Sequence, residues 1–258
     1  MDLRMQSPAQ AMSKVPAVTL GFWIIKILAT TLGETGGDTV TMTMNLGYLV
    51  GTAIFLAALI VLVTLQIRAR AFHPALYWAT IVASTTAGTT LADFADRSLG
   101  IGYAGGSTLL LICVLAMLGL WYRSQGTVSV DRVDTPKAEA FYWATITFSQ
   151  TLGTALGDWT ADDTGLGYSG AALLFGAALA LLAVAYFWTR TSRVLLFWAA
   201  FILTRPLGAT LGDFLDKPVT EGGLALSRTL ATVVIAGAML VCLFVIPQRA
   251  RAHPDSRR

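Results

Sequence analysis

The stretch WATITFSQTLGTALGD, residues 143–158, decides the fold because close variants of it occur three more times in the chain. The other copies are WIIKILATTLGETGGD, WATIVASTTAGTTLAD and WAAFILTRPLGATLGD, at residues 23–38, 78–93 and 198–213. In every copy a glycine follows the tryptophan by ten residues and an aspartate follows it by fifteen. Another glycine stands twenty-four residues after each tryptophan. Self-similarity at a fixed spacing is typical of repeat proteins, so we predict four copies of one structural unit.

The composition places these units in a membrane. Of the 258 residues, 55% are hydrophobic and 13% are charged, whereas soluble domains carry about 25% charged residues. A water-soluble enzyme is therefore excluded. A helix needs about 20 apolar residues to cross a bilayer, and eight stretches meet this need: 17–36, 46–67, 75–93, 101–122, 140–157, 166–189, 194–213 and 224–246. We predict an all-α polytopic membrane protein with eight transmembrane helices.

Each repeat holds two predicted spans, so all four repeats would cross the membrane in the same direction. We expect four parallel two-helix repeats around a pseudo-symmetry axis along the membrane normal. The odd-numbered spans are polar and would line this axis, while the apolar even-numbered spans would face lipid. The expected single transmembrane domain, 17–246, has repeats at about 17–67, 75–122, 140–189 and 194–246, a tail of 1–16 and a basic tail of 247–258.

With its four Trp-x9-Gly-x4-Asp units, the chain resembles a family of uncharacterised bacterial membrane proteins made of four tandem two-helix repeats of unknown function. The resemblance covers residues 17–246. It implies the fold and a bacterial source, and it brings no activity. No cofactor is expected, because the two histidines and two cysteines do not form a ligand set.

Lysine and arginine residues gather on one side of the predicted membrane domain. Thirteen of the eighteen fall in segments that share one side, three fall on the other, and two lie inside spans. Because cytoplasmic loops carry an excess of Lys and Arg, we expect a multi-pass protein of the bacterial inner membrane, embedded in lipid, with both termini cytoplasmic. The same pattern explains the net charge of +3, so a nucleic-acid partner is not expected.

Each odd-numbered span carries a polar stripe. Residues 3, 7, 11 and 15 places after each tryptophan share one helix face, and every stripe ends in an aspartate. We predict that four carboxylates converge at the outer mouth and bind an ion or metal there. The predicted substrate-binding residues are Asp38, Asp93, Asp158, Asp213, Glu34, Thr30, Thr85 and Gln150, with the four aspartates as metal ligands. Two alternatives stay open: aspartates that merely end the helices, and a 2+2 arrangement with two clefts.

Charged residues inside membrane spans are rare and energetically costly, so those in this chain indicate where its function lies. We predict a secondary transporter of a small inorganic cation, divalent in the leading version (Mn²⁺, Ca²⁺ or Mg²⁺), with Glu34 and Asp38 exchanging protons. Lys26 and Arg205 would couple charge movement, Arg205 as a tethered counter-cation. The alternatives are a passive cation channel and a non-transporting sensor or assembly module. No catalytic constellation is recognisable, so we do not expect an enzyme.

Overall fold

The structure is a computed structural model that describes residues 13–251. Within this range the chain is all-helical and contains no named strand. The eight long helices are α1 (Leu20–Asp38), α2 (Gly47–Arg68), α3 (Pro74–Asp93), α4 (Tyr103–Gln125), α5 (Pro136–Asp158), α6 (Gly167–Trp188), α7 (Arg193–Asp216) and α8 (Arg228–Val245). Each coincides with one predicted span, and the ends differ by no more than four residues. Five of them, α2, α4, α6, α7 and α8, are long and apolar enough to cross a membrane.

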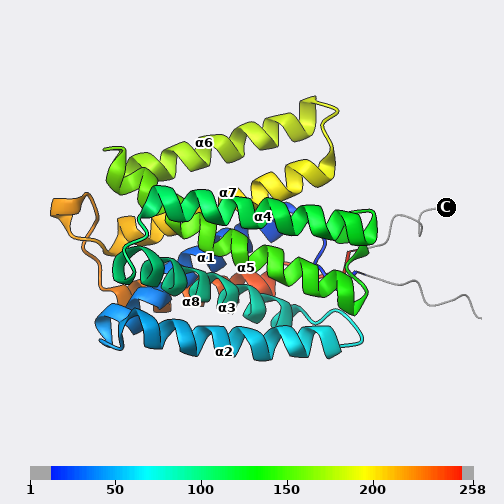
Figure 1. Cartoon of the computed structure of the whole chain (residues 1–258), viewed down its shortest axis with the longest axis horizontal. Helices are drawn as coiled ribbons and strands as arrows, with labels where there is room; N and C mark the ends of the chain where they lie inside the picture. The colour runs from blue at the N-terminus through cyan, green and yellow to red at the C-terminus, as the bar shows by residue number, and fades with distance from the viewer. Residues whose placement is uncertain (1–12, 252–258) are drawn as a thin grey trace, which may run out of the picture.

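The odd-numbered helices form an inner ring. α1 packs against α3 and α7, and α5 packs against the same two helices. The even-numbered helices lie outside this ring: α2 packs on α3, α4 on α5, α6 on α7, and α8 on α1. Figure 1 shows these helices extended along the long axis of the molecule. Each outer helix therefore covers the inner helix of the following repeat, and α8 closes the circle.

The repeated glycines allow the inner helices to touch. A Cβ atom added to Gly88 of α3 would lie 2.9 Å from the backbone of Gln150 on α5, closer than real Cβ atoms come. The same relation recurs around the ring, with each glycine against the residue seven places after the next tryptophan: Gly33 on Thr85, Gly88 on Gln150, Gly153 on Arg205, and Gly208 on Thr30. Small residues at helix interfaces permit such close backbone approach inside a membrane.

Aromatic side chains fill one end of the inner ring. The residue before each repeat tryptophan is also aromatic, and each contacts the tryptophan of the next repeat. The four ring-centroid pairs are Phe22–Trp78 (5.5 Å), Tyr77–Trp143 (5.6 Å), Tyr142–Trp198 (6.2 Å) and Phe197–Trp23 (5.8 Å). The hydroxyl oxygens of Tyr77 and Tyr142 lie 2.6 Å apart and are buried. We call these eight residues the aromatic layer; it closes its end of the ring.

The opposite end contains the aspartates and the links to the outer helices. Asp38, Asp93 and Asp158 are each the last residue of an inner α-helix, and a π-helical turn follows each of them. The glycine twenty-four residues after each tryptophan has a φ between +64° and +84°, a region that residues with side chains rarely adopt. It stands at the start of the outer helix in the first three repeats and six residues before α8 in the fourth. This conformation explains why all four repeats have glycine there. In the fourth repeat α7 continues beyond Asp213 to Asp216, and a 3-10 turn, Val219–Glu221, replaces the π-helical turn.

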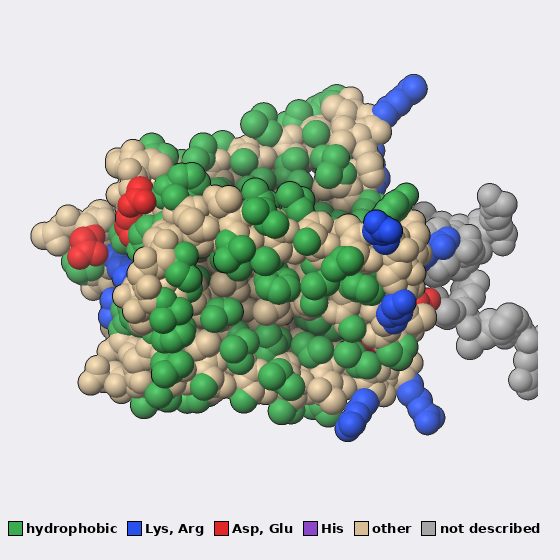
Figure 2. All heavy atoms as spheres, viewed as in Figure 1, with side chains coloured by type: hydrophobic (Ala, Val, Ile, Leu, Met, Phe, Trp, Pro, Cys, Tyr) green, Lys and Arg blue, Asp and Glu red, His purple; other side chains and the backbone are tan. Residues whose placement is uncertain are grey.

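Charge is distributed unequally between the two ends of the bundle. Figure 2 shows a mainly hydrophobic flank, with most Lys and Arg side chains at one end and most Asp and Glu side chains at the other. At the basic end, residues 13–16 of the predicted first tail are packed into the protein, where the Ser13 hydroxyl donates to the carbonyl of Val130 (2.7 Å). The rest of that tail, and 252–258 of the second, lie outside the described residues.

Candidate functional site

The polar stripes predicted from the sequence all face the interior. We call their sixteen residues the axial column, because they lie on the four helices of the inner ring. Every member is 3% exposed or less: Lys26, Thr30, Glu34, Asp38, Ile81, Thr85, Thr89, Asp93, Ile146, Gln150, Thr154, Asp158, Phe201, Arg205, Ala209 and Asp213. A charged face buried in this way requires partners inside the protein.

Arg205 joins all four inner helices at one point of the column. Its Nη2 atom donates to the carboxylate of Glu34 on α1 (2.8 Å) and to the hydroxyls of Thr89 on α3 (2.6 Å) and Thr154 on α5 (2.5 Å). Thr89 also donates to the same Glu34 oxygen (3.3 Å). One guanidinium nitrogen therefore lies within hydrogen-bond distance of three oxygen atoms from three helices, which share its two hydrogens.

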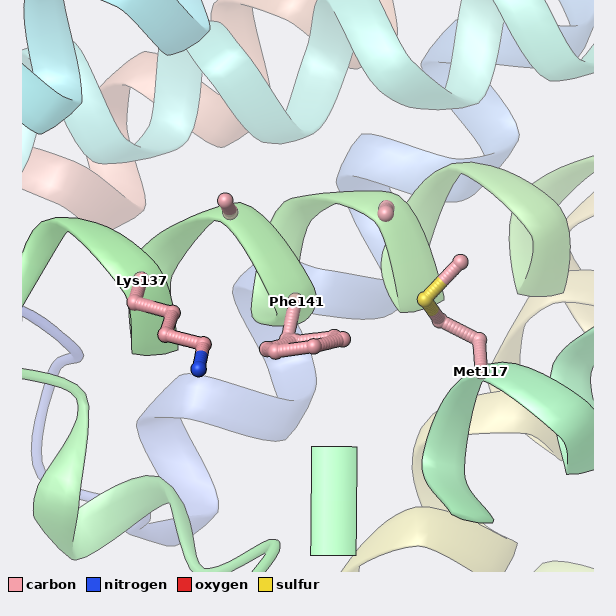
Figure 3. Close-up of a pocket in the computed structure, with 5 residues that line it drawn as sticks. Met117, Lys137 and Phe141 are labelled. Atoms are coloured by element: carbon pink, nitrogen blue, oxygen red, sulfur yellow. The ribbon is translucent and has the colours of Figure 1, made fainter. Parts of the chain in front are cut away.

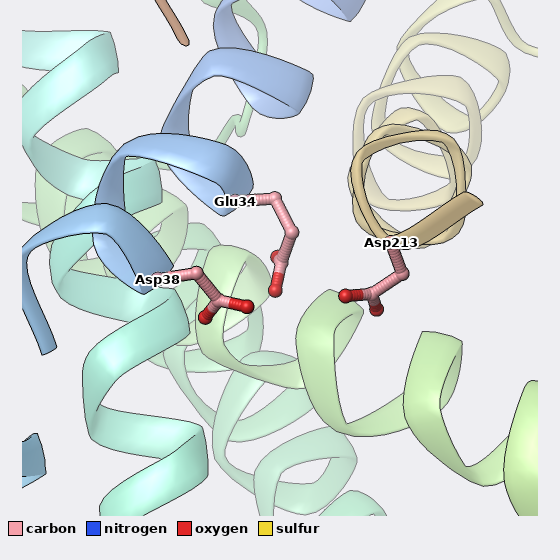
Figure 4. Close-up of side chains that lie close together, drawn as sticks. All are labelled: Glu34, Asp38 and Asp213. Atoms are coloured by element: carbon pink, nitrogen blue, oxygen red, sulfur yellow. The ribbon is translucent and has the colours of Figure 1, made fainter. Parts of the chain in front are cut away.

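Three carboxylates meet close to this point, toward the end of the ring that contains the aspartates. Single oxygen atoms of Glu34, Asp38 and Asp213 all lie within 4.8 Å of one another, and Figure 4 shows the three side chains directed into a common space from α1 and α7. Lys217 closes the space: its Nζ atom lies 3.1 Å from Asp213 Oδ1 and 3.3 Å from Asp38 Oδ2. Arg228 lies 3.8 Å from the same oxygen of Asp38 and 3.4 Å from Asp216.

The other two aspartates share a different basic residue. The Arg97 side chain lies 2.9 Å from Asp93, four residues before it in the chain, and 4.0 Å from Asp158 on α5. The four aspartates are thus divided into two acid–base–acid clusters, Asp213–Lys217–Asp38 and Asp93–Arg97–Asp158. Of the four proposed metal ligands, Asp38 and Asp213 come together with Glu34.

Lys217 lies just beyond the end of α7 and is 6% exposed. Burial by itself disfavours the charged ammonium, but the carboxylates of Asp213 and Asp38 outweigh it and raise the pKa of Lys217 well above its usual value. The two carboxylates therefore favour the charged form of Lys217. A mobile cation that enters this space has to displace it.

A family of repeats accounts for nearly the whole chain. The family described as "Repeat of Unknown Function (DUF347)" matches residues 21–72, 76–127, 141–192 and 196–251. The chain belongs to the DUF347 repeat family. Each matched segment contains one inner and one outer helix, as predicted for the tandem repeats. No curated protein and no solved structure matches the chain.

Within the DUF347 repeats, two residues of the site were not singled out from the sequence. Arg97 and Lys217 stand nineteen residues after the tryptophans of the second and fourth repeats, where the first and third repeats have Met42 and Asp162. Extending the comparison of the four repeats four residues past the aspartate would have revealed them. A basic residue four places after an aspartate lies on the same helix face and can pair with it.

A shallow hollow lies outside the inner ring, between α4 and α5 of the DUF347 repeats. Met117, Lys137, Ala140, Phe141 and Ala144 line it, and Figure 3 shows Met117 and Phe141 on either side. Its walls are almost entirely apolar, and it contains no residue of the axial column. The hollow belongs to the outer surface of the bundle rather than to the polar site.

Proposed function

We propose that the protein is a secondary transporter that moves a cation along the axial column. In this proposal all eight helices cross the bacterial inner membrane, as parallel repeats around an axis along the membrane normal. The polar helices α1, α3 and α5 are tolerated there because α2, α4 and α8 pack on their outer sides. The aromatic layer and both termini would face the cytoplasm, an orientation that the Lys and Arg bias supports.

The observation that carries the proposal is the position of the Arg205 Nη2 atom, held by oxygens of Glu34, Thr89 and Thr154. Carboxylate and hydroxyl oxygens are the ligands that hard cations such as Mn²⁺, Ca²⁺ and Mg²⁺ prefer. Lys217 occupies a similar place between Asp38 and Asp213. Two tethered cations thus fill the positions that a transported ion would take.

The two ends of the column suggest how access would alternate. The aromatic layer closes one end, and the two acid–base–acid clusters close the other. An entering cation would replace Lys217 between Asp38 and Asp213 and then Arg205 beside Glu34. Between the departure of the cation and the return of Arg205 and Lys217, protons bound by Glu34 and Asp38 would compensate the buried carboxylates, which couples the two movements. A passive channel is disfavoured because Arg205 spans the column.

Flux into proteoliposomes tests the proposal. Mn²⁺, Ca²⁺, Mg²⁺, Na⁺ and K⁺ are compared with and without a pH gradient, using the wild type, Asp38→Asn and Glu34→Gln. We expect selective flux of one of these ions, accelerated by the gradient and lost in both variants. Asp163→Asn is the matched control, because Asp163 is an exposed acid at the same end of the protein. Absence of flux of every ion would overturn the proposal and favour a non-transporting sensor or assembly module.

A further inference from the structure

We propose that a cation reaches the three carboxylates from beside Asp38, through the contact between α1 and α8, and that Arg228 controls this entry. The inference rests on the transport proposed above and adds the route and the residue that limits access. Its support is a difference among the four corners of the ring, where a corner is one repeat aspartate together with the outer helix that packs on its inner helix.

An aromatic residue follows the aspartate at three corners and is missing at the fourth. The residue directly after the aspartate is Phe94, Trp159 or Phe214 in the second, third and fourth repeats, and it is Thr39 in the first. Phe214 packs in the same apolar cluster as Tyr168 of the outer helix α6. A threonine at this position presents a hydroxyl to the outer helix in place of an apolar ring.

The outer helices show the same difference. The residue after the glycine that stands twenty-four places past the tryptophan is a tyrosine in the first three repeats, and each tyrosine interacts electrostatically with the aspartate of the following repeat: Tyr48 with Asp93, Tyr103 with Asp158, and Tyr168 with Asp213. By this relation a fourth tyrosine would stand beside Asp38. The fourth repeat has Gly223 instead, where an added Cβ would overlap the carbonyl of Lys217.

The corner at Asp38 is polar as a result. The hydroxyl oxygens of Thr39 and Thr232 on α8 lie 3.2 Å apart. Thr232 also lies beside Gly36 of α1, which has no side chain to cover it. Arg228, the first residue of α8, extends toward Asp38 from one turn before Thr232. A cation that enters here meets hydroxyl groups and one positive charge, whereas aromatic rings stand at the other corners.

Arg228 is the solvent-exposed end of a chain of charges that leads inward. Its side chain is 27% exposed, compared with 7% for Lys217 and 1% for Asp38. The Arg228 Nε atom lies 3.8 Å from Asp38 Oδ2, and Lys217 Nζ lies 3.3 Å from the same oxygen. Since Asp38 belongs to the group of three carboxylates, the route from solvent to that group passes Arg228 first.

The other exposed basic residue near the aspartates, Arg97, does not lead to this group. Its side chain is 34% exposed and pairs with Asp93 and Asp158. Neither carboxylate belongs to the group that contains Glu34, which in turn contacts Arg205. The corner at Asp38 is therefore the one that connects an exposed charge with the centre of the axial column.

The position of Arg228 suits a side chain that moves. Its Nε atom lies between two carboxylates, 3.4 Å from Asp216 Oδ2 and 3.8 Å from Asp38 Oδ2, and makes no hydrogen bond in the described part of the chain. A positive charge at the first residue of a helix also opposes the helix dipole, so α8 itself gains no stability from it. Movement toward Asp216 would free the outer side of Asp38 for a cation, and return of Arg228 would expel it.

Initial rates of flux in proteoliposomes test the role of Arg228, with the ion among Mn²⁺, Ca²⁺, Mg²⁺, Na⁺ and K⁺ that the wild type transports. Arg228→Gln removes the charge that competes for Asp38, so KM for the cation should fall several-fold while the maximal rate is retained. Arg228→Lys keeps the charge and should keep the wild-type KM. Arg190→Gln, at an exposed arginine near the opposite end, is the matched control. An arginine that merely holds α8 in place would lower the maximal rate without lowering KM.

Thiol labelling locates the route without measuring flux. Thr39→Cys is made in a background without Cys113 and Cys242, and its reaction with the cationic reagent 2-(trimethylammonium)ethyl methanethiosulfonate is timed. We expect Arg228→Gln to accelerate this reaction several-fold. The reaction of Phe94→Cys, at the equivalent position beside Asp93, should not change.

Asp216→Asn replaces Arg228→Gln in both measurements if that variant does not fold. Arg228 is then left with Asp38 alone, so KM should rise and labelling at position 39 should become slower. Wild-type flux with an unchanged KM in the variant would overturn the role of Arg228 and leave the transport proposal standing. Absence of flux would remove the transport proposal, and the labelling rate at position 39 would then decide the route: a changed rate supports it and an unchanged rate overturns it.

Discussion

Lys217 and Arg97 occupy equivalent positions in the fourth and second repeats, each four residues after its own aspartate and each in contact with the aspartate of the next inner helix. The first and third repeats have no basic residue at this position. The two-helix unit therefore occurs four times around the ring, whereas the basic residue beside the aspartate occurs in only two of the four repeats. Each of the two basic residues thereby reduces the repulsion between two of the four aspartates.

Removal of Lys217 should destabilise the protein strongly. Lys217→Met leaves Asp38 and Asp213 buried without the ammonium that joins them, and breaking one side of a buried ion pair costs about 3–5 kcal/mol. We expect a clearly lower Tm in detergent, and partial recovery when Asp213→Asn is added, because one of the two uncompensated charges then disappears. Lys137→Met, a change at an exposed lysine, should leave Tm unchanged. An unaltered Tm for Lys217→Met would contradict the ion pairing.

The glycine contacts between inner helices can be tested one methyl group at a time. In Gly153→Ala the added Cβ would overlap the Arg205 side chain and lie 2.9 Å from Cδ of Pro206. Overpacking of this kind costs about 1–3 kcal/mol, so Tm should fall. Gly176→Ala is the matched control, since no atom lies within 4 Å of the added Cβ on α6. Equal unfolding temperatures for the two variants would mean that the inner helices are not in this register.

The sequence is sufficient to predict the helices and the direction of their polar faces. Apolar runs set the eight helices, and the shared spacing of tryptophan, glycine and aspartate indicates one unit repeated four times. A charged stripe avoids lipid, so the burial of residues such as Thr85 and Gln150 also follows from the sequence. The aromatic residue before each tryptophan is equally regular, although the aromatic layer was not predicted from it.

The pairing of individual side chains depends on something that a single sequence does not contain, the register between helices of different repeats. Arg205 and Glu34 are 171 residues apart, and they meet because Gly208 packs on Thr30 and sets α7 against α1. Likewise, the equal spacing of the four aspartates does not tell which of them share a basic residue. Arg97 and Lys217, which occur in two of the four repeats, pair with them two by two.

The two tyrosine hydroxyls that form the hydrogen bond in the aromatic layer should have coupled effects on stability. Tyr77→Phe leaves the Tyr142 hydroxyl buried without its partner at 2.6 Å, which costs about 1–3 kcal/mol. The double variant Tyr77→Phe/Tyr142→Phe removes both polar groups and should recover most of the lost Tm. Tyr122→Phe, at an exposed tyrosine of α4, serves as the control. If the double variant were less stable than either single one, the two hydroxyls would have other partners.

The proposed orientation is open to chemical labelling. In a background without Cys113 and Cys242, cysteines are introduced singly as Asp163→Cys and Gln125→Cys, both at exposed positions at opposite ends of the bundle. A membrane-impermeant maleimide added to spheroplasts should label position 163 and should label position 125 only after lysis, because the Lys and Arg bias places the latter in the cytoplasm. The reverse pattern would invert the topology and, with it, the direction in which the column opens.

The contact between Arg205 and Glu34 is best measured by a double-mutant cycle. Arg205→Met leaves the Glu34 carboxylate buried and uncompensated, and Glu34→Gln leaves the guanidinium in the same position, so each single change should lower the free energy of unfolding by about 3–5 kcal/mol. The double variant removes both charges and should lose less than the sum, with a coupling energy of about 0.5–3 kcal/mol. Additive losses would show that Arg205 and Glu34 do not interact. The three-oxygen site on which the transport proposal rests would then have no basis.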